Sequence, residues 1–347
     1  MTGLADRLLK AWQRFWFVPQ QTSTLAVFRI AFGLLATVWT ATQGPNILAF
    51  YGPHGILPET PNSGTGAWGL LDVSDSSAAV VVVFVLTLTA SVALTLGLFT
   101  RLAAFLVFAG VVTFEHRNML VTNSGDGLIR NLAFFTVLTP SGEALSLDRL
   151  RKKPENFWEF PARAPWGLRL IQIQLSVGYL SAVWHKAGNS LWREGTAVSY
   201  SLRMQDIHHL PTPAFITHSV VLTEILTYGT LASEFALGVL IWNRVARPYV
   251  LVIGVALHLS IDLSIMVGFF SYAVLTAYLA FITPETSARR IVTTRDFLRR
   301  RFRRREAGEP EEPVAVPVPE KPDPGEALVS GPDELPSLNA QRTEVSA

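Results

Sequence analysis

Residues 179–195 read YLSAVWHKAGNSLWREG, in which an apolar helix runs into His185 and Lys186 before the chain turns at Gly188 toward Trp192. A lysine at the end of a membrane segment is costly unless a partner or a function retains it. This stretch therefore predicts a transmembrane helix that ends in a group of ionisable side chains.

The composition places the whole chain in a membrane. Hydrophobic residues make up 49% of the 347 residues and charged residues only 16%, and the mean hydropathy is +0.32. An ordinary soluble domain carries about 25% charged residues. The sequence contains no cysteine, which excludes disulfides, thiolate catalysis and thiolate metal sites.

Apolar runs long enough to cross about 30 Å of hydrocarbon recur along the chain. They cover residues 24–43, 77–97, 102–119, 127–141, 167–187, 214–242 and 248–268, and a shorter run covers residues 269–283. The pattern predicts an all-α polytopic membrane helix bundle with about eight transmembrane helices. At the last hairpin, Gly268 marks either a tight turn or a re-entrant bend.

Basic residues are distributed unevenly between the connecting segments. Three basic residues precede the first run, whereas the loop over residues 44–76 has no Lys or Arg. Five basic residues follow the fourth run, namely Arg149, Arg151, Lys152, Lys153 and Arg163. Short loops rich in Lys and Arg stay in the cytoplasm. We therefore expect both termini to be cytoplasmic.

The ends of the chain differ from its apolar middle. Residues 1–20 alternate apolar and basic side chains at helical spacing, which predicts an amphipathic helix in the membrane interface. The transmembrane domain is predicted over residues 21–285. Residues 286–306 form a polybasic cytoplasmic segment that favours anionic lipid rather than nucleic acid, and residues 307–347 predict a disordered tail rich in Pro and Glu.

Several polar residues fall inside the apolar runs. Glu234 lies in the sixth run and Arg29 early in the first, and ionisable groups at such depth usually pair or line a cavity. We predict a structural ion pair between them. His258 and Asp262 lie four residues apart and so share a helix face. This spacing suits either acid–base chemistry or a satisfied pair in the core.

The segment EHRNMLVTNSGDG, residues 115–127, joins the third run to the fourth. Asp126 is predicted to cap the start of the fourth helix. His116 and Arg117 are not explained as interface anchors, where Leu or Trp would serve better. They are therefore candidates for binding a substrate.

Two interpretations of Lys186 remain open from the residues alone. In a partly dry pocket, burial favours the neutral amine, which accepts protons, and a protonated His185 would act in the same direction. Alternatively, Lys186 extends to the outer surface while Trp184 and Trp192 lie in the aromatic belt.

Four motifs carry a resemblance to a known family. They are FRIAFG at 28–33 with FYGPHGILP at 50–58, HRNMLVTNSGDG at 116–127 with SLD at 146–148, the segment 179–195, and HLSIDLSIMVGFFSY at 258–272. With these motifs the chain resembles the bacterial members of the HTTM (horizontally transferred transmembrane) family. That family is similar to the membrane domain of vitamin K-dependent gamma-carboxylase.

The resemblance implies a function and a place for it. Lys186 stands where the carboxylase has the lysine that deprotonates reduced vitamin K, His258 matches a histidine, and Glu234 an acidic residue. Oxygenation of that quinol yields the base that prepares a glutamate side chain for carboxylation. The resemblance thus implies a carboxylase-like enzyme with a reduced vitamin K or menaquinone-type quinol as cofactor and no metal, in the cytoplasmic (plasma) membrane of a bacterium.

The residues and the resemblance together predict a site. Lys186 and His258 are expected to be catalytic. The predicted substrate-binding residues are His116, Arg117, Asp126, His185, Trp192 and Asp262. We expect only a cytoplasmic tail after the last run, so the carboxylase domain that holds a protein substrate has no counterpart here. The alternatives are a noncatalytic membrane factor for maturation or export of a small peptide or protein, a lipid-binding scaffold and, third, a transporter.

Overall fold

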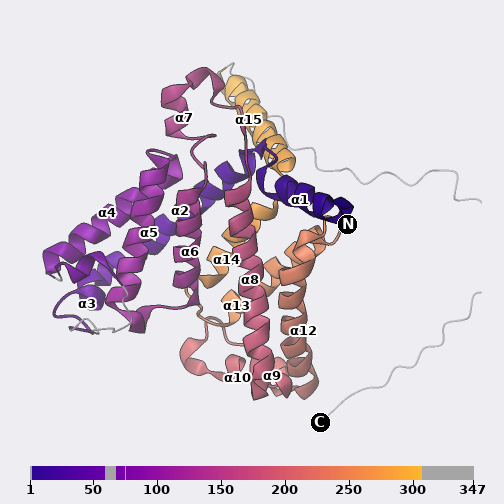
Figure 1. Cartoon of the computed structure of the whole chain (residues 1–347). Helices are drawn as coiled ribbons and strands as arrows, with labels where there is room; N and C mark the ends of the chain where they lie inside the picture. The colour runs from indigo at the N-terminus through magenta and orange to yellow at the C-terminus, as the bar shows by residue number, and fades with distance from the viewer. Residues whose placement is uncertain (1, 59–67, 75, 307–347) are drawn as a thin grey trace, which may run out of the picture. The chain divides into compact units, whose positions relative to one another are not determined.

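Helices make up most of the structure. The computed structural model describes residues 2–58, 68–74 and 76–306. Residues up to Thr294 form one unit that contains the whole bundle, and α15 (Pro284–Glu306) continues beyond it. The main helices are α2 (Ser23–Gln43), α4 (Ser77–Leu96), α5 (Thr100–Arg117), α6 (Ser124–Leu138), α8 (Trp166–Gly188), α12 (Val220–Val239), α13 (Arg247–Ser264) and α14 (Phe270–Tyr278) (Figure 1).

Shorter elements close the two ends of the bundle. One end, which we name the basic pole, carries α1 (Thr2–Phe17), α7 (Leu147–Lys152) and the antiparallel strands β1 (Gln20–Gln21) and β2 (Ala162–Arg163). The other end, the distal pole, carries α3 (Ile47–Tyr51), α9 (Ser190–Arg193), α10 (Ala197–Arg203) and α11 (Ala214–His218). Single 3-10 turns cover Gly44–Asn46, Leu70–Asp72, Met119–Val121, Pro154–Asn156, Gln205–Ile207, Leu240–Trp242 and Leu279–Phe281. The tail predicted over residues 307–347 lies outside the described residues.

Within the described residues, four helical segments are long and apolar enough to cross a membrane. They are Ser23–Tyr51, Ser77–Leu96, Val220–Trp242 and Arg247–Ser264, and a shorter apolar helix covers Phe270–Phe281. These segments support the predicted all-α membrane bundle. The number of about eight crossings and the cytoplasmic position of both termini stay predictions.

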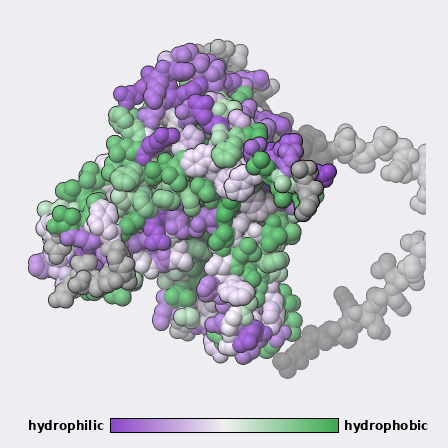
Figure 2. All heavy atoms as spheres, viewed as in Figure 1, coloured by the Kyte–Doolittle hydropathy of each residue, from purple (hydrophilic) through white to green (hydrophobic). Residues whose placement is uncertain are grey.

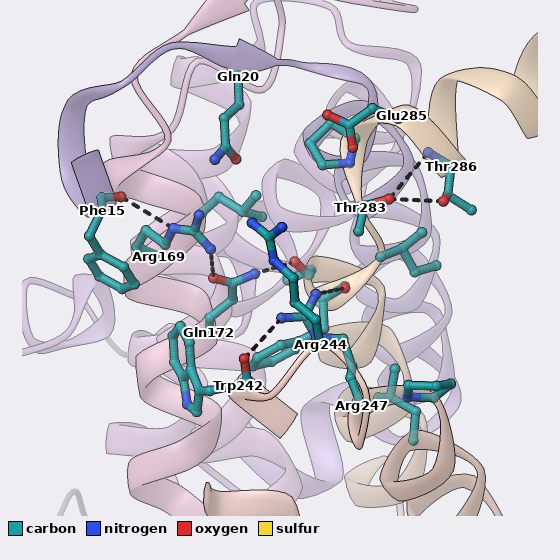
Figure 3. A pocket seen from close by; sticks show the side chains of 17 residues that line it. Phe15, Gln20, Arg169, Gln172, Trp242, Arg244, Arg247, Thr283, Glu285 and Thr286 are labelled. Carbon is teal, nitrogen blue, oxygen red and sulfur yellow. Dashed lines mark hydrogen bonds between the residues drawn. The ribbon is translucent and has the colours of Figure 1, made fainter. Parts of the chain in front are cut away.

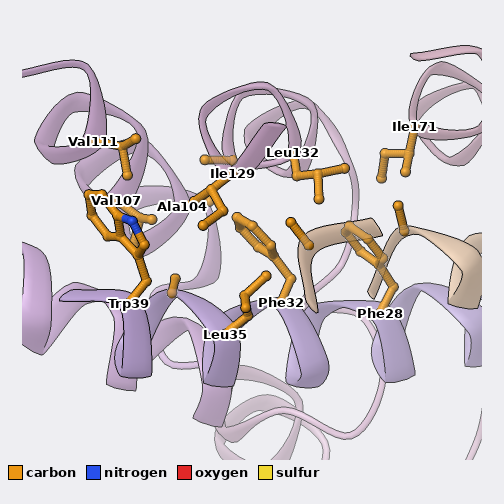
Figure 4. Close-up of a cluster of buried hydrophobic side chains, with 14 of the residues drawn as sticks. Phe28, Phe32, Leu35, Trp39, Ala104, Val107, Val111, Ile129, Leu132 and Ile171 are labelled. Atoms are coloured by element: carbon orange, nitrogen blue, oxygen red, sulfur yellow. The ribbon is translucent and has the colours of Figure 1, made fainter. Parts of the chain in front are cut away.

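Helix α2 supplies one wall of the core. Phe28, Phe32, Leu35 and Trp39 recur every three or four residues and therefore share one helix face. All four are buried, and they pack with side chains of α5, α6 and α8 (Figure 4). Large apolar side chains on the outer faces of α4, α5 and α12 are exposed, as a lipid-facing surface requires (Figure 2).

Glycines let neighbouring helices approach closely. A Cβ at Gly33 of α2 would lie 2.6 Å from the backbone nitrogen of Thr95 in α4, and one at Gly110 of α5 would lie 2.0 Å from the Thr87 hydroxyl. Small residues at such crossings are typical of membrane bundles, where packing rather than water drives association.

The structure divides the apolar run predicted over residues 214–242. Helix α11 ends at His218, and the Ser219 hydroxyl accepts a hydrogen bond from the Leu222 amide at 3.3 Å, which starts α12 at Val220. The candidate membrane span in this run therefore begins at Val220, six residues after the start of the run, because hydropathy alone does not separate a serine cap from its apolar neighbours. In the last hairpin, Gly268 lies in a turn with φ +60°.

Hydrogen bonds of Arg29 and of the SLD motif hold the loops of the basic pole to the helices. Arg29 is fully buried and donates hydrogen bonds to the carbonyls of Ser141, Ala144 and Leu145, at 3.0, 3.1 and 2.6 Å. The Asp148 carboxylate accepts hydrogen bonds from the amides of Phe99 and Thr100, both at 2.8 Å. These contacts fix the loop before α7 to the starts of α2 and α5.

Replacing Gly33 by alanine tests the close helix crossing. The new methyl group would meet the backbone of Thr95, which cannot move as a flexible side chain can. We expect Gly33→Ala to lower the free energy of unfolding by about 1–3 kcal/mol, seen as a lower melting temperature in detergent. Gly178→Ala is the matched control, since no atom lies within 4 Å of its Cβ position. Equal melting temperatures for both variants would contradict this packing.

The pH dependence of stability tests the role of Asp148. Burial raises the pKa of this carboxyl, but hydrogen bonds from Thr100 and Phe99 and the charge of Lys152 outweigh it, so its pKa is lowered. A lowered folded-state pKa gives stability above the ordinary value of about 3.9 that is lost as pH falls through the folded value. Asp148→Asn should therefore melt at a lower temperature at pH 7, and the difference should disappear as pH falls through the folded-state pKa of Asp148.

The exposed Glu155→Gln variant is the control for this measurement. It should melt together with the wild type across the same range of pH. A constant difference between wild type and Asp148→Asn at all pH values would show that the carboxylate charge is not what stabilises the fold.

Candidate functional site

A cluster of polar side chains lies among the apolar helices toward the distal pole. Helix α8 contributes Tyr179 and Lys186, α12 contributes Glu234, α13 contributes His258 and α14 contributes Tyr278. The four helices contact one another in turn, α8 with α12, α12 with α13, α13 with α14 and α14 with α8. We name these five residues the polar cluster.

Lys186 is held by two contacts. Its Nζ forms an ion pair with the Glu234 carboxylate, and it lies 4.7 Å from the centre of the Trp192 ring. The side chain of Lys186 is 25% exposed and that of Glu234 is 9% exposed. The amine is therefore directed into the bundle and shielded, not extended into open solvent.

Tyr179 joins His258 to Tyr278. Its hydroxyl lies 2.7 Å from Nε2 of His258 and also forms a hydrogen bond with the Tyr278 hydroxyl. Gly254 makes room for this arrangement, since a Cβ there would lie 2.3 Å from the Tyr278 hydroxyl oxygen. The Phe270 ring closes another side of the imidazole, with the ring centres 5.5 Å apart.

Two atoms of the polar cluster have no hydrogen-bond partner among the described residues. They are Oε2 of Glu234 and Nδ1 of His258, and both are buried. Glu234 lies close enough to Tyr179 and Tyr278 to interact with them electrostatically, as Lys186 does with His258. A buried polar atom without a partner costs about 1–3 kcal/mol, which a ligand or a water molecule can recover.

The position of the protons follows from the hydrogen-bond chain. If Tyr278 donates to Tyr179 and Tyr179 donates to Nε2 of His258, then the imidazole carries its own proton on Nδ1. If instead Nε2–H of His258 donates to Tyr179 and Tyr179 donates to Tyr278, then Nδ1 carries no proton and is a free acceptor. In either case His258 offers one unused nitrogen for a ligand.

Two predicted pairs are not formed. Glu234 pairs with Lys186, whereas Arg29 binds backbone carbonyls, so the predicted Arg29–Glu234 ion pair is wrong. Arg29 and Glu234 were paired because both fall in the inner half of the membrane, but depth in the membrane does not tell which helices are neighbours. Asp262 accepts a hydrogen bond from Tyr272 at 2.8 Å, and His258 turns to Tyr179 instead. A shared helix face thus did not produce the predicted His258–Asp262 contact.

Three of the predicted binding residues hold loops together elsewhere. Arg117 is buried and donates to the carbonyls of Leu57, Gly52 and Pro58. The N-cap of α6 is Asn123 and not Asp126, so the predicted N-cap is wrong by three residues. The Asp126 carboxylate instead accepts hydrogen bonds from the Asn123 amide at 2.8 Å and from the Trp39 indole at 2.7 Å. His116 lies 3.4 Å from the Asp72 carboxylate. These contacts fasten the segments before and after α5 at the distal pole.

His185 does not join the polar cluster. Its Nδ1 lies 2.7 Å from the Ser181 carbonyl on its own helix, and the side chain is exposed. Of the predicted residues, the structure therefore brings together Lys186, Trp192, Glu234 and His258. Sequence reasoning missed Tyr179 and Tyr278. Tyr179 lies seven residues before Lys186, so it shares the same helix face, and this spacing could have revealed it.

A double-mutant cycle tests the ion pair of Lys186 with Glu234. Removing one partner leaves a partly buried charge unpaired, whereas removing both leaves none. We expect the single variants Lys186→Met and Glu234→Leu each to lose more stability than the double variant, with a coupling energy of about 1 kcal/mol or more in detergent unfolding.

The exposed pair of Lys10 with Asp6 on α1 is the matched control. The same cycle there should give a coupling energy below about 0.5 kcal/mol, because solvent screens both charges. Additive effects of the Lys186 and Glu234 substitutions would show that their contact contributes nothing to the fold.

The comparisons with known proteins agree with the motifs. A family model described as HTTM domain matches residues 17–285, which is most of the chain. No curated protein and no solved structure matches it. The matched residues run from the end of α1 to the start of α15 and include the whole polar cluster. The chain therefore belongs to the HTTM family.

Proposed function

We propose that the polar cluster binds an isoprenoid quinol, or a similar lipid with an acidic hydroxyl group, and that Lys186 takes a proton from that hydroxyl. The observation that carries the proposal is the pairing of Lys186 with Glu234 beside the chain of Tyr179, His258 and Tyr278. Ionisable groups inside a membrane domain are retained mainly for function. The resemblance to the carboxylase points to the same lysine.

The unpartnered atoms of the polar cluster fit such a ligand. A quinol hydroxyl can donate to Oε2 of Glu234 and can accept from Nδ1 of His258 when that nitrogen carries a proton. The ligand would enter from the lipid, because the cluster lies on helices whose outer faces are apolar and exposed. A reduced quinone would supply the oxygen-dependent base that carboxylation of a glutamate needs.

Each side chain has a distinct role in this proposal. Lys186 must be neutral to act as a base, and Glu234, which contacts it, can store the proton that Lys186 first gives up. The hydrogen bonds from Tyr278 to Tyr179 and onward to His258 orient the imidazole so that Nδ1–H faces the developing oxyanion. Donors fixed in advance in a dry site stabilise such charge most effectively.

A second candidate is a noncatalytic membrane factor that binds the same lipid without turnover. The contacts of Lys186 favour this candidate, because its charged amine is already paired with the Glu234 carboxylate and lies against the Trp192 ring. Such a factor would serve the maturation or export of a small peptide or protein. Both candidates predict lipid binding, and they differ in whether the lysine must release a proton.

The proposal also includes the membrane in which the chain lies and its orientation there. We place the chain in the cytoplasmic membrane of a bacterium, with both termini and the basic pole on the cytoplasmic side. The polybasic segment of residues 286–306 would then contact anionic lipid. The basic residues of α7 and of the strand β2 support this orientation.

Lys186→Arg separates the two candidates. Arginine keeps the positive charge and the ion pair with Glu234, but it does not lose its proton in proteins. With reduced menaquinone, oxygen and labelled bicarbonate, we expect the variant to bind the quinol within about threefold of wild type while quinone epoxide formation falls at least about 100-fold. Binding is measured by quenching of tryptophan fluorescence and the epoxide by chromatography.

His185→Gln is the matched control, because it changes the neighbouring residue that points away from the polar cluster. It should leave binding and epoxide formation unchanged. Quinol binding without epoxide in the wild type would select the noncatalytic factor. Absence of quinol binding to the wild type would overturn both candidates.

A further inference from the structure

A cavity lies at the basic pole, at the other end of α8 from Lys186. Its volume is about 730 Å³. Its walls come from the end of α1, the start of α8, the connection between α12 and α13, and the segment that joins α14 to α15 (Figure 3). Arg169 and Lys186 are 17 residues apart on α8, so the two sites are separated by about 25 Å along the helix.

Three arginines meet in this cavity. Arg169 comes from α8, Arg244 from the connection after α12, and Arg247 from the first turn of α13. Figure 3 shows the Arg244 side chain reaching into the space between the other two. The guanidinium groups lie close enough to repel one another. Glu285 is the one acidic residue among those that line the cavity, and its side chain is exposed.

The chain holds two of the three guanidinium groups in place. Arg169 donates to Oε1 of Gln172 at 2.8 Å and lies 4.9 Å from the Phe15 ring centre. Gln172 is itself buried and donates to the Ala280 carbonyl at 2.6 Å. Arg247 donates to the Ile241 carbonyl at 2.8 Å. These contacts direct positive charge into the cavity without neutralising it.

Arg244 has a different environment. It forms no hydrogen bond or ion pair with the residues that the structure describes, although two like charges lie beside it. Its side chain is exposed, so water solvates it when no ligand is bound, and an anion held in the cavity would offset the repulsion between the three like charges. Guanidinium groups match the geometry of phosphate oxygens and bind them through paired hydrogen bonds.

We propose that this cavity binds a phosphate group, and that the phosphate belongs to the head group of an anionic phospholipid. The walls support a lipid as the source, because Trp242, Phe281 and Leu251 line the cavity beside the arginines. Leu4, Leu8 and Trp12 of α1 are 68%, 63% and 59% exposed. This pattern is that of a helix lying in the membrane interface, which places the cavity at the depth of lipid head groups.

The site goes beyond the proposed function and is independent of it. It uses no residue of the polar cluster. It also uses none of the basic side chains of the polybasic segment, of which only Thr286 lines the cavity. If the phosphate site proves wrong, the quinol proposal is therefore unaffected, and if the quinol proposal proves wrong, the phosphate site is unaffected.

The test is a lipid titration of the full chain in neutral detergent, followed by native mass spectrometry. Dioleoylphosphatidylglycerol is the anionic probe and dioleoylphosphatidylcholine the zwitterionic one. We expect wild type to prefer the anionic lipid and Arg244→Gln to weaken that binding at least about tenfold. Since Arg244 is exposed and forms no hydrogen bond or ion pair with the described residues, the variant should keep the wild-type melting temperature.

Arg14→Gln is the matched control, because it removes one exposed positive charge from α1 at the same pole. It should weaken binding less than about twofold, the effect of general attraction alone. Equal losses in Arg14→Gln and Arg244→Gln would overturn the site. A third titration includes inorganic phosphate as competitor. If inorganic phosphate binds wild type more tightly than Arg244→Gln while wild type shows no preference for the anionic lipid, the phosphate site stands and the lipid source is overturned.

Discussion

The hydrocarbon of a membrane offers no water to buried polar groups, so each group must find a partner in the chain or in a ligand. Much of this structure follows from that constraint. Arg29 and Arg117 bind backbone carbonyls, and Asp126 joins the Trp39 indole to a helix start. Among the described residues the constraint is met only in part, because one oxygen of Glu234 and one nitrogen of His258 lack a partner, as do the Nε atoms of Arg29 and Arg117. The incomplete pairing of Glu234 and His258 is the physical basis on which we propose that a lipid hydroxyl binds in the polar cluster.

Close packing decides which polar groups meet. Gly238 of α12 faces Leu180 of α8, where a Cβ would lie 2.8 Å from the leucine side chain, and this approach brings Glu234 next to Lys186. Gly254 of α13 likewise admits the Tyr278 hydroxyl. Since hydrophobic burial does not drive helices together in lipid, such small residues set the neighbours of each helix. The chemistry of the polar cluster therefore depends on residues that carry no functional group.

The two poles of the bundle offer opposite chemistry to the membrane. Toward the distal pole, a carboxylate, two phenols, an imidazole and an amine lie together in the bundle. At the basic pole, three arginines line an open cavity with little negative charge to balance them. The first environment suits proton transfer to and from a neutral lipid, and the second suits a phosphate head group. Helix α8 contributes Lys186 to the polar cluster and Arg169 to the cavity, so one helix takes part in both proposed lipid sites.

The sequence by itself determined the helical membrane class and singled out Lys186, His258 and Glu234 as ionisable residues within apolar runs. Composition, periodicity and capping are local properties, and a costly charge in an apolar run is visible without any fold. Only the tertiary structure decided the partners: Lys186 rather than Arg29 for Glu234, Tyr179 rather than Asp262 for His258, and the meeting of the three arginines. Partnership depends on which helices are neighbours and on how each is rotated, and both are set by close packing between residues far apart in the chain.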